Sequence, residues 1–211
     1  MDEPVQAPDQ EISDQRRLKG ARARASIARH AADVASVEGL TGLSLGRLAE
    51  DLGVSKSGVA TLFGNKENLQ LAAVAAAREV FIDHVIRPAR SAEPGIARLR
   101  ALMDRWFEYV SAPVMPGGCF RAACVPEFDS RPGAVRDALA ADRTDWFAVL
   151  AKEIRRAQEQ GAMPGVDPQA MAFQFDAVMA AANTAARLGD PTALPTARTI
   201  VDTLLGSAAE Q

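Results

Sequence analysis

The clearest pattern of hydrophobic and polar positions lies between Ser44 and Asn68, where two short helical repeats follow one another. In the first repeat, apolar residues recur at offsets of three, four and seven, which is the spacing of one helical face. Gly53 offers the positive φ that ends a helix, and Gly64 does the same after the second repeat. Each repeat is preceded by a serine that can cap it. The pattern predicts two helices joined by a short turn, with inward-facing Leu45, Leu48, Ala49, Leu52, Val59, Leu62 and Phe63.

The remaining chain shows helical spacing in segments separated by proline and glycine, and no segment with the alternation of a strand. Pro88 is expected to end the helix that Asn65 caps, and Asp167 is expected to cap the helix after residue 168. The predicted fold is therefore all-α, with a three-helix helix-turn-helix domain followed by a helical body. The expected helices cover residues 16–38, 44–52, 55–63, 66–87, 96–111, 119–128, 134–160, 169–188 and 192–207.

Charge divides the chain more sharply than its net value of −3 suggests. Residues 1–15 hold five acids and no base, and with two prolines they are expected to form a disordered arm. Residues 16–66 hold nine bases against four acids, whereas residues 67–211 hold 15 bases against 18 acids. A basic module on an acidic body is typical of a DNA-binding domain, 16–66, joined to a domain of another function, 67–211.

A helix, a short turn and a second helix form the DNA-reading helix-turn-helix, whose second helix enters the major groove. Lys56 can contact guanine or phosphate, and the Thr61 methyl can meet a thymine methyl. The basic residues at the start of the first helix can contact phosphate or form a solvated basic face, and we favour phosphate contact for some of them. The predicted DNA-binding residues are Arg24, Ser44, Ser55, Lys56, Ser57, Gly58, Thr61 and Lys66.

The order of residues 48–56, Leu-Ala-Glu-Asp-Leu-Gly-Val-Ser-Lys, followed by Phe63, Lys66, Glu67 and Leu69, resembles the DNA-binding domain of tetracycline-repressor (TetR) family regulators. The resemblance covers residues 20–75. It implies a homodimeric transcriptional regulator, most often a repressor, that binds a palindromic operator in double-stranded DNA and responds to a small-molecule effector. The two cysteines form no disulfide framework, which indicates a cytoplasmic protein. Ala60 and Leu62 depart from the family pattern, because these positions often hold aromatic residues that contact phosphate.

The resemblance also implies dimerisation through the last two long helices, and their small and apolar residues favour a close four-helix interface over a purely intramolecular core. The predicted dimer residues are Phe173, Ala177, Ala181, Thr184, Leu194, Ile200, Val201 and Leu204. The aromatic and polar residues near the helix breaks can either pack in the core or contact a ligand, and the sequence does not decide between the two. The predicted ligand residues are Trp106, Tyr109, Phe120, Phe128, Trp146, Phe175, Met179 and Asn183.

Two sequences in the body, Pro-Gly-Gly-Cys-Phe at 116–120 and Pro-Glu-Phe-Asp-Ser-Arg-Pro-Gly at 126–133, resemble a subset of the same regulators. The two cysteines, Cys119 and Cys124, are expected to be free and buried, and redox sensing is a minority interpretation. No metal, cofactor or catalytic motif is present, so we expect no enzyme, and no apolar run is long enough for a membrane span. The alternatives are a nonspecific architectural DNA-binding protein and, less favoured, a thiol-dependent enzyme.

Overall fold

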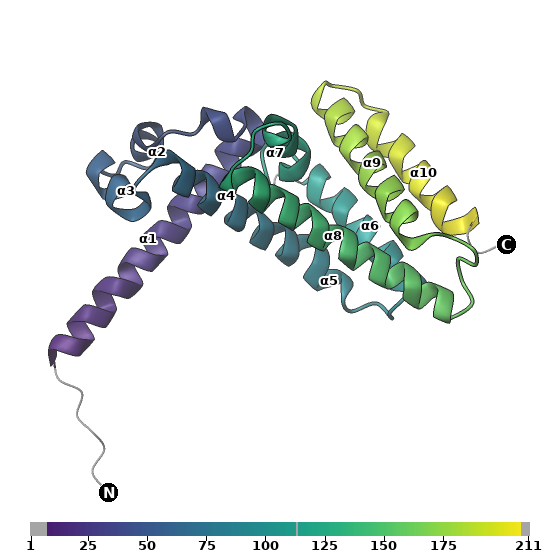
Figure 1. The fold of residues 1–211 in the computed structure, drawn as a ribbon. Helices are drawn as coiled ribbons and strands as arrows, with labels where there is room; N and C mark the ends of the chain where they lie inside the picture. Colours follow the sequence, from purple (N-terminus) through teal and green to yellow (C-terminus); the bar gives the residue numbers. More distant parts are fainter. Residues whose placement is uncertain (1–7, 113, 208–211) are drawn as a thin grey trace, which may run out of the picture.

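The computed structural model describes residues 8–112 and 114–207, and within these ranges the chain is helical and contains no strand. Figure 1 shows an elongated molecule, with the helix-turn-helix at one end and the last two helices side by side at the other. The elements are α1 (Pro8–Glu38), η1 (Leu40–Gly42), α2 (Leu45–Asp51), α3 (Lys56–Phe63), α4 (Lys66–Phe81), η2 (Ile82–Ile86), α5 (Arg87–Ala89), α6 (Ile96–Ser111), α7 (Phe120–Phe128), α8 (Ala134–Glu159), α9 (Pro168–Arg187) and α10 (Ala193–Ser207).

The first helix begins at Pro8, eight residues before the expected start at Arg16. The expected disordered arm is therefore wrong for residues 8–15, while residues 1–7 lie outside the described residues. Proline suits the first position of a helix, because the N–H that it lacks would have no helical partner there. The N-terminal half of α1 projects away from the rest of the molecule (Figure 1).

The head, by which we mean α1, η1, α2 and α3, has a small apolar core. Leu48 and Val59 are completely buried, and Phe63 is nearly so, as the spacing predicts. The predicted caps are confirmed, because the side chains of Ser44, Ser55 and Asn65 each accept a backbone N–H three residues further on. These caps satisfy N–H groups that a helix leaves without partners at its start.

One continuous helical segment, α4–η2–α5, leads from the head into the body. Its middle turn, Ile82–Ile86, is a π-helix, a widened turn that is rare and often found at functional sites. Pro88 does not end the segment, which runs one residue further to Ala89, because proline is tolerated in the first turn of α5. The N-terminal part of this segment packs on α1, and its central part packs on α8.

The centre of the body is an aromatic cluster that surrounds a buried ion pair. The ring of Phe81 meets Tyr109 and Trp146 edge to face, with centroids 5.7 and 5.0 Å apart. The Arg121 guanidinium lies 3.9 Å from the centroid of Phe81 and donates to Asp142 at 2.6 Å. This cluster joins α4, α6, α7 and α8. Burial raises the pKa of the Tyr109 hydroxyl well above its ordinary value.

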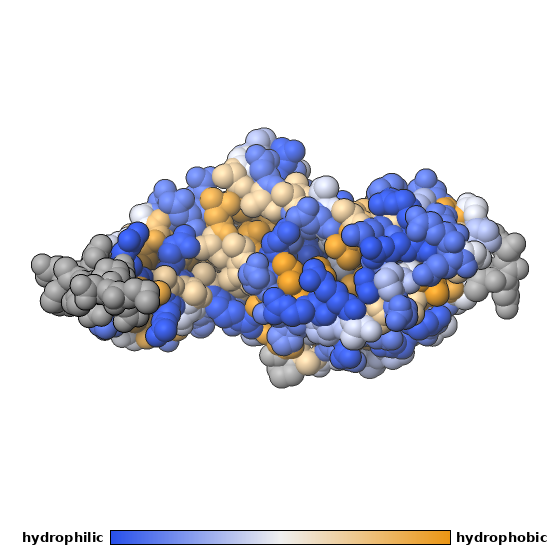
Figure 2. All heavy atoms as spheres, turned by 90° about the horizontal axis from the view of Figure 1, so that it is seen from below, coloured by the Kyte–Doolittle hydropathy of each residue, from blue (hydrophilic) through white to orange (hydrophobic). Residues whose placement is uncertain are grey.

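Figure 2 shows the underside of the molecule as largely hydrophilic, with hydrophobic residues gathered near the centre and toward the N-terminal end. None of the helices in the described ranges combines the length and apolar character that a membrane span requires.

Candidate nucleic-acid interface and body cavities

The helix α3 is a short, capped helix whose outer face is polar. Lys56, Ser57 and Thr61 are exposed, whereas Val59 on the opposite face is completely buried. Gly58 lies beside the cap, and a Cβ atom at this position would come 2.9 Å from Ser55 Oγ. Glycine therefore weakens the helix by its flexibility but leaves room for the capping hydroxyl.

The polar side chains of α3 differ in whether they have a partner within the protein. The Thr61 hydroxyl donates to the carbonyl oxygen of Ser57 at 2.8 Å, which leaves its oxygen free to accept a hydrogen bond from outside. Within the described part of the chain Lys56 forms no hydrogen bond or ion pair, and its stem lies near Gly46 of α2. Among the predicted DNA-binding residues, Lys56 thus has the cationic group most available to a ligand.

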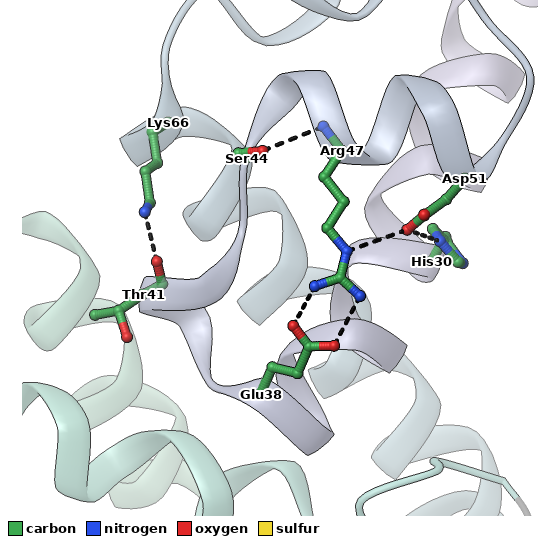
Figure 3. Close-up of polar contacts among 7 residues, drawn as sticks. All are labelled: His30, Glu38, Thr41, Ser44, Arg47, Asp51 and Lys66. Atoms are coloured by element: carbon green, nitrogen blue, oxygen red, sulfur yellow. Dashed lines mark hydrogen bonds and ion pairs between the residues drawn. The ribbon is translucent and has the colours of Figure 1, made fainter.

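A polar network holds α1, η1 and α2 together, and Figure 3 shows its side chains. Arg47 forms a two-pronged ion pair with Glu38, with one of its two contacts at 2.7 Å, and lies 3.7 Å from Asp51. His30 Nε2 lies 3.2 Å from the same Asp51 carboxylate. The hydrogen bond from Arg47 is the main reason that the pKa of Glu38 lies below its ordinary value. The network fixes α2 relative to α1, and α2 in turn supports α3.

Two predicted DNA contacts are engaged inside the head. Lys66 Nζ donates to the carbonyl oxygen of Thr41 at 2.5 Å, so its ammonium group braces η1 (Figure 3). Arg24 Nε lies 3.4 Å from the Leu62 carbonyl oxygen, and its guanidinium lies 5.0 Å from the centre of the Phe63 ring. Both side chains are exposed, and their contact with phosphate stays a prediction.

The body contains two neighbouring cavities at α7. The larger, of about 640 Å³, lies among α7, α8 and α9, and the smaller, of about 460 Å³, lies between α7 and α8. They share Val125 and Arg143 in their walls, and Arg143 donates to Asp176 at 2.9 Å. The larger volume suits a small organic molecule, since ligand pockets commonly have ~300–1,000 Å³.

Three predicted ligand residues line these cavities: Trp146 and Met179 the larger one and Phe128 the smaller one. Tyr109 and Phe120 line only a space of about 10 Å³, too small for an effector. Trp106, Phe175 and Asn183 are buried and line neither of these two cavities, so their contact with a ligand stays a prediction. Asn183 instead accepts the backbone N–H of Cys119 at 2.8 Å. Helical spacing identifies inward-facing residues, but it does not separate a filled core from a hollow.

The helices α9 and α10 present an exposed apolar face, and its α9 part also forms one wall of the larger cavity. Phe173 is 58 % exposed, Leu188 83 % and Ile200 42 %, and Ala177, Ala181 and Thr184 lie exposed between them on α9. Val201 is a correction to the predicted dimer residues, because it is only 2 % exposed and packs within the protomer. Leu194 and Leu204 are partly buried against the same core. The other predicted dimer residues remain accessible, and their contact with a partner stays a prediction.

Both cysteines are free and buried, as expected. Burial raises the pKa of the Cys124 thiol, which disfavours the thiolate that nucleophilic or redox chemistry needs. Within the described residues, His, Cys, Asp and Glu side chains form no group of three or more that could hold a metal ion.

The head combines a capped helix pair with an exposed second helix, and the body combines cavities with an apolar helical face. This is the organisation of a helix-turn-helix transcriptional regulator. A family model described as the tetracyclin repressor-like C-terminal domain matches residues 95–201. The chain belongs to the tetracycline-repressor (TetR) family.

Solved structures agree with this assignment. A TetR transcriptional regulator from Chloroflexus aurantiacus is 25 % identical, with a TM-score of 0.82 over 92 % of this chain and 97 % of that chain. A TetR-family regulator from Cytophaga hutchinsonii is 22 % identical, with a TM-score of 0.81 over 92 % and 98 %. AibR, solved with isovaleryl coenzyme A and operator DNA, is 23 % identical, with a TM-score of 0.64 over 76 % and 86 %. The comparison with curated proteins found no match.

Sequence reasoning missed three polar residues of the body. Arg121 and Asp142 lie in the aromatic cluster, and Glu127 of α7 accepts hydrogen bonds from η1. Of these three, only Glu127 could have been singled out from the sequence, since it lies in the segment 126–133 that resembles other regulators. The pairing of Arg121 with Asp142 spans 21 residues and depends on how α7 packs on α8.

Proposed function

We propose that the protein is a ligand-responsive transcriptional repressor that binds a palindromic operator as a homodimer in the cytoplasm. Residues 16–66 serve as the DNA-binding domain, and residues 67–211 bind the effector and dimerise. The observation that carries the proposal is the outer face of α3, where Lys56, Ser57 and Thr61 are exposed on a helix capped at its start. The AibR complex, which contains a coenzyme A thioester and operator DNA, supports the combination of functions by analogy.

A dimer places two copies of α3 at a fixed separation, and successive major grooves on one side of a duplex are ~34 Å apart. The exposed apolar face of α9 and α10 supports such a dimer, because it lies at the end of the molecule away from α3 (Figure 1). An effector in the body shifts the segment α4–η2–α5 and with it the separation of the two α3 helices. Effector and DNA then oppose each other by a coupling of ~1–3 kcal/mol, and the effect is reciprocal.

The protein acts by binding and not by catalysis. The alternative of a thiol-dependent enzyme is disfavoured by the burial of Cys119 and Cys124. An architectural DNA-binding protein remains the second candidate, because the basic residues on the projecting part of α1 can hold phosphates without reading bases. The two candidates differ in sequence preference. A regulator prefers its operator by about 10³-fold or more, whereas an architectural protein shows little preference.

Selection of bound duplexes from a random pool tests the proposal. The parent protein should return a palindromic consensus, and Lys56→Ala should relax or lose it. Lys152→Ala provides the matched control, because Lys152 is an exposed lysine on α8. Binding without a consensus would favour the architectural protein, and the absence of DNA binding would refute both candidates. A consensus that survives in Lys56→Ala would show that other residues of α3 read the bases.

A further inference from the structure

The two sequences at 116–120 and 126–133 have no role in the proposed DNA contact, yet the structure places both at the junction of body and head. The N–H of Gly117 donates to Ser36 Oγ on α1 at 2.9 Å, and a Cβ atom at Gly117 would lie 1.7 Å from the Ser36 carbonyl oxygen. Only glycine fits such a close approach. Arg29 adds a hydrogen bond of 2.7 Å to the carbonyl oxygen of Val114. The chain before α7 therefore docks tightly on α1.

Glu127 of α7 extends the contact between body and head to η1, the turn that connects α1 and α2. The N–H of Leu40 donates to its Oε2 at 2.6 Å, and the Thr41 hydroxyl donates to its Oε1 at 2.7 Å. Gly39, with φ +78°, leaves room for the carboxylate, since a Cβ atom there would come 2.0 Å from Oε1. Hydrogen bonds to a carboxylate are stronger than neutral ones. One side chain of the body thus holds the first two residues of the turn η1, which ends two residues before the cap of α2.

The same turn is held from its other side by α4. Lys66 Nζ donates to the carbonyl oxygen of Thr41, and Gln70 Nε2 donates to that of Leu40 at 2.8 Å. Any movement of α7 relative to α4 must therefore strain or break contacts of η1. Because only Leu43 lies between η1 and the capping Ser44, such a movement reaches α2 and then α3.

The opposite side of α7 lines the cavities. Ala122, Val125 and Pro126 contribute to the wall of the larger cavity, and Val125 also contributes to the smaller one. Pro126 lies inside the helix and has no N–H, so α7 lacks the hydrogen bond that would normally reach the Ala122 carbonyl. Val125 and Glu127 are two residues apart in α7, so a displacement of Val125 is transmitted to Glu127 through the backbone.

We propose that Glu127 is a positioning residue for the DNA-reading helices, and that α7 transmits occupancy of the cavity to η1. This inference rests on the proposed function and deepens its regulation, because it adds a direct route through α7 to the route through α4. A ligand that displaces Val125 shifts the carboxylate of Glu127 away from Leu40 and Thr41. The head then loses the contact that orients α2 and α3.

The test uses DNA as the ligand and Trp146 as the reporter, since coupling between two sites is reciprocal. Trp146 lines the larger cavity, and the protein has two tryptophans. Trp106→Phe leaves Trp146 alone, and the Trp106 Nε1 that it removes has no hydrogen-bond partner in the described structure. A labelled duplex carrying the selected consensus reports binding by anisotropy, while Trp146 emission is recorded in the same titration.

In the Trp106→Phe background, the emission of Trp146 should change with the same midpoint as the anisotropy. Adding Glu127→Ala should reduce the amplitude of this emission change by at least about half and weaken DNA binding about tenfold, the effect expected for charge-assisted hydrogen bonds. Glu127→Gln keeps one acceptor and should restore part of the amplitude. Glu159→Ala, which removes an exposed glutamate of α8, should leave both signals unchanged.

The outcomes separate the inference from the function on which it rests. If the parent protein does not bind the duplex, the proposed function fails and the inference fails with it. If DNA binds but Trp146 does not respond, or if Glu127→Ala keeps the full emission change, the function stands and the inference is refuted. Thr41→Val removes one of the two hydrogen bonds at an exposed residue, and it provides the same test if Glu127→Ala does not fold.

Discussion

In the head, α2 and α3 keep their apolar residues inside and their charges at the surface, whereas α8 and α9 in the body do the reverse at several places. Asp142 of α8 is buried with Arg121, and Phe173 of α9 is exposed. Polar surface on α3 suits the base edges and phosphates of a duplex. Apolar surface on α9 suits a second protein surface. The difference indicates that the two ends of the molecule are built for different partners, and four experiments test it.

The largest effect is expected from removing the buried carboxylate. Asp142→Ala leaves Arg121, whose side chain is 12 % exposed, without its ion-pair partner among the aromatic rings. Removing one partner of a buried pair costs ~3–5 kcal/mol of unfolding free energy, measured by denaturant titration. Asp202→Ala is the control, because it breaks the exposed pair with Arg100 and should cost less than ~1 kcal/mol. Equal losses in both variants would contradict the contrast between a buried and an exposed pair.

A charge on the apolar face should separate the dimer. Ala181→Glu places a carboxylate on the exposed face of α9, and sedimentation velocity should show a monomer. DNA affinity should then fall by ~100-fold or more, because the second α3 no longer binds at a high effective concentration. Ala148→Glu makes the same change at an exposed position of α8 and should leave the dimer intact. If the protein with Ala181→Glu is still a dimer, the interface lies on another surface of the molecule.

A smaller effect is expected from pH at the surface of the head. The pKa of Glu38 is lower in the folded protein than its ordinary value of 4.5, because Arg47 binds its carboxylate. A depressed carboxyl pKa stabilises the folded state above the ordinary pKa, and this contribution is lost as pH falls below 4.5 toward the folded pKa. The parent should therefore melt above Glu38→Gln at pH 7, and the difference should shrink below pH 4.5. A difference that stays constant with pH would refute the assignment.

The smallest effect is expected at Gly58. Gly58→Ala gains ~1 kcal/mol of helix propensity, but its Cβ atom would lie 2.9 Å from the capping Ser55 Oγ. Displacing the cap costs ~1 kcal/mol, so the melting temperature should change little. In a Ser55→Ala background the cap is already absent, and Gly58→Ala should then stabilise the protein. If Gly58→Ala stabilises the parent and the Ser55→Ala variant equally, the capping hydroxyl of Ser55 and residue 58 do not interact.

Local signals in the sequence predicted local structure well. Ser44, Ser55, Asn65 and Asp167 were all identified as caps, because a cap depends on residues three positions apart. The start of α1 was missed because an acidic stretch with prolines fits both a disordered arm and the first turns of a helix. The cavity was predicted only in part. Trp106 and Trp146 show the same helical spacing and both are buried, and only the packing between helices places Trp146, and not Trp106, in the wall of the larger cavity.

The π-turn at Ile82–Ile86 sets how the end of the connecting segment is oriented. A wide turn holds one residue more than an α-helical turn, and each α-helical residue rotates the chain by ~100° about its axis. Deleting a single residue between Ile82 and Ile86 would close this turn into an α-helical turn and leave Pro88 and Ala89 on the same side of the helix, whereas deleting one residue from α4 would swing them to another side. In the second case Ala89, which is 1 % exposed, would leave its packed position, so the length of α4 is as constrained as its composition, while the wide turn can accommodate the loss of one residue.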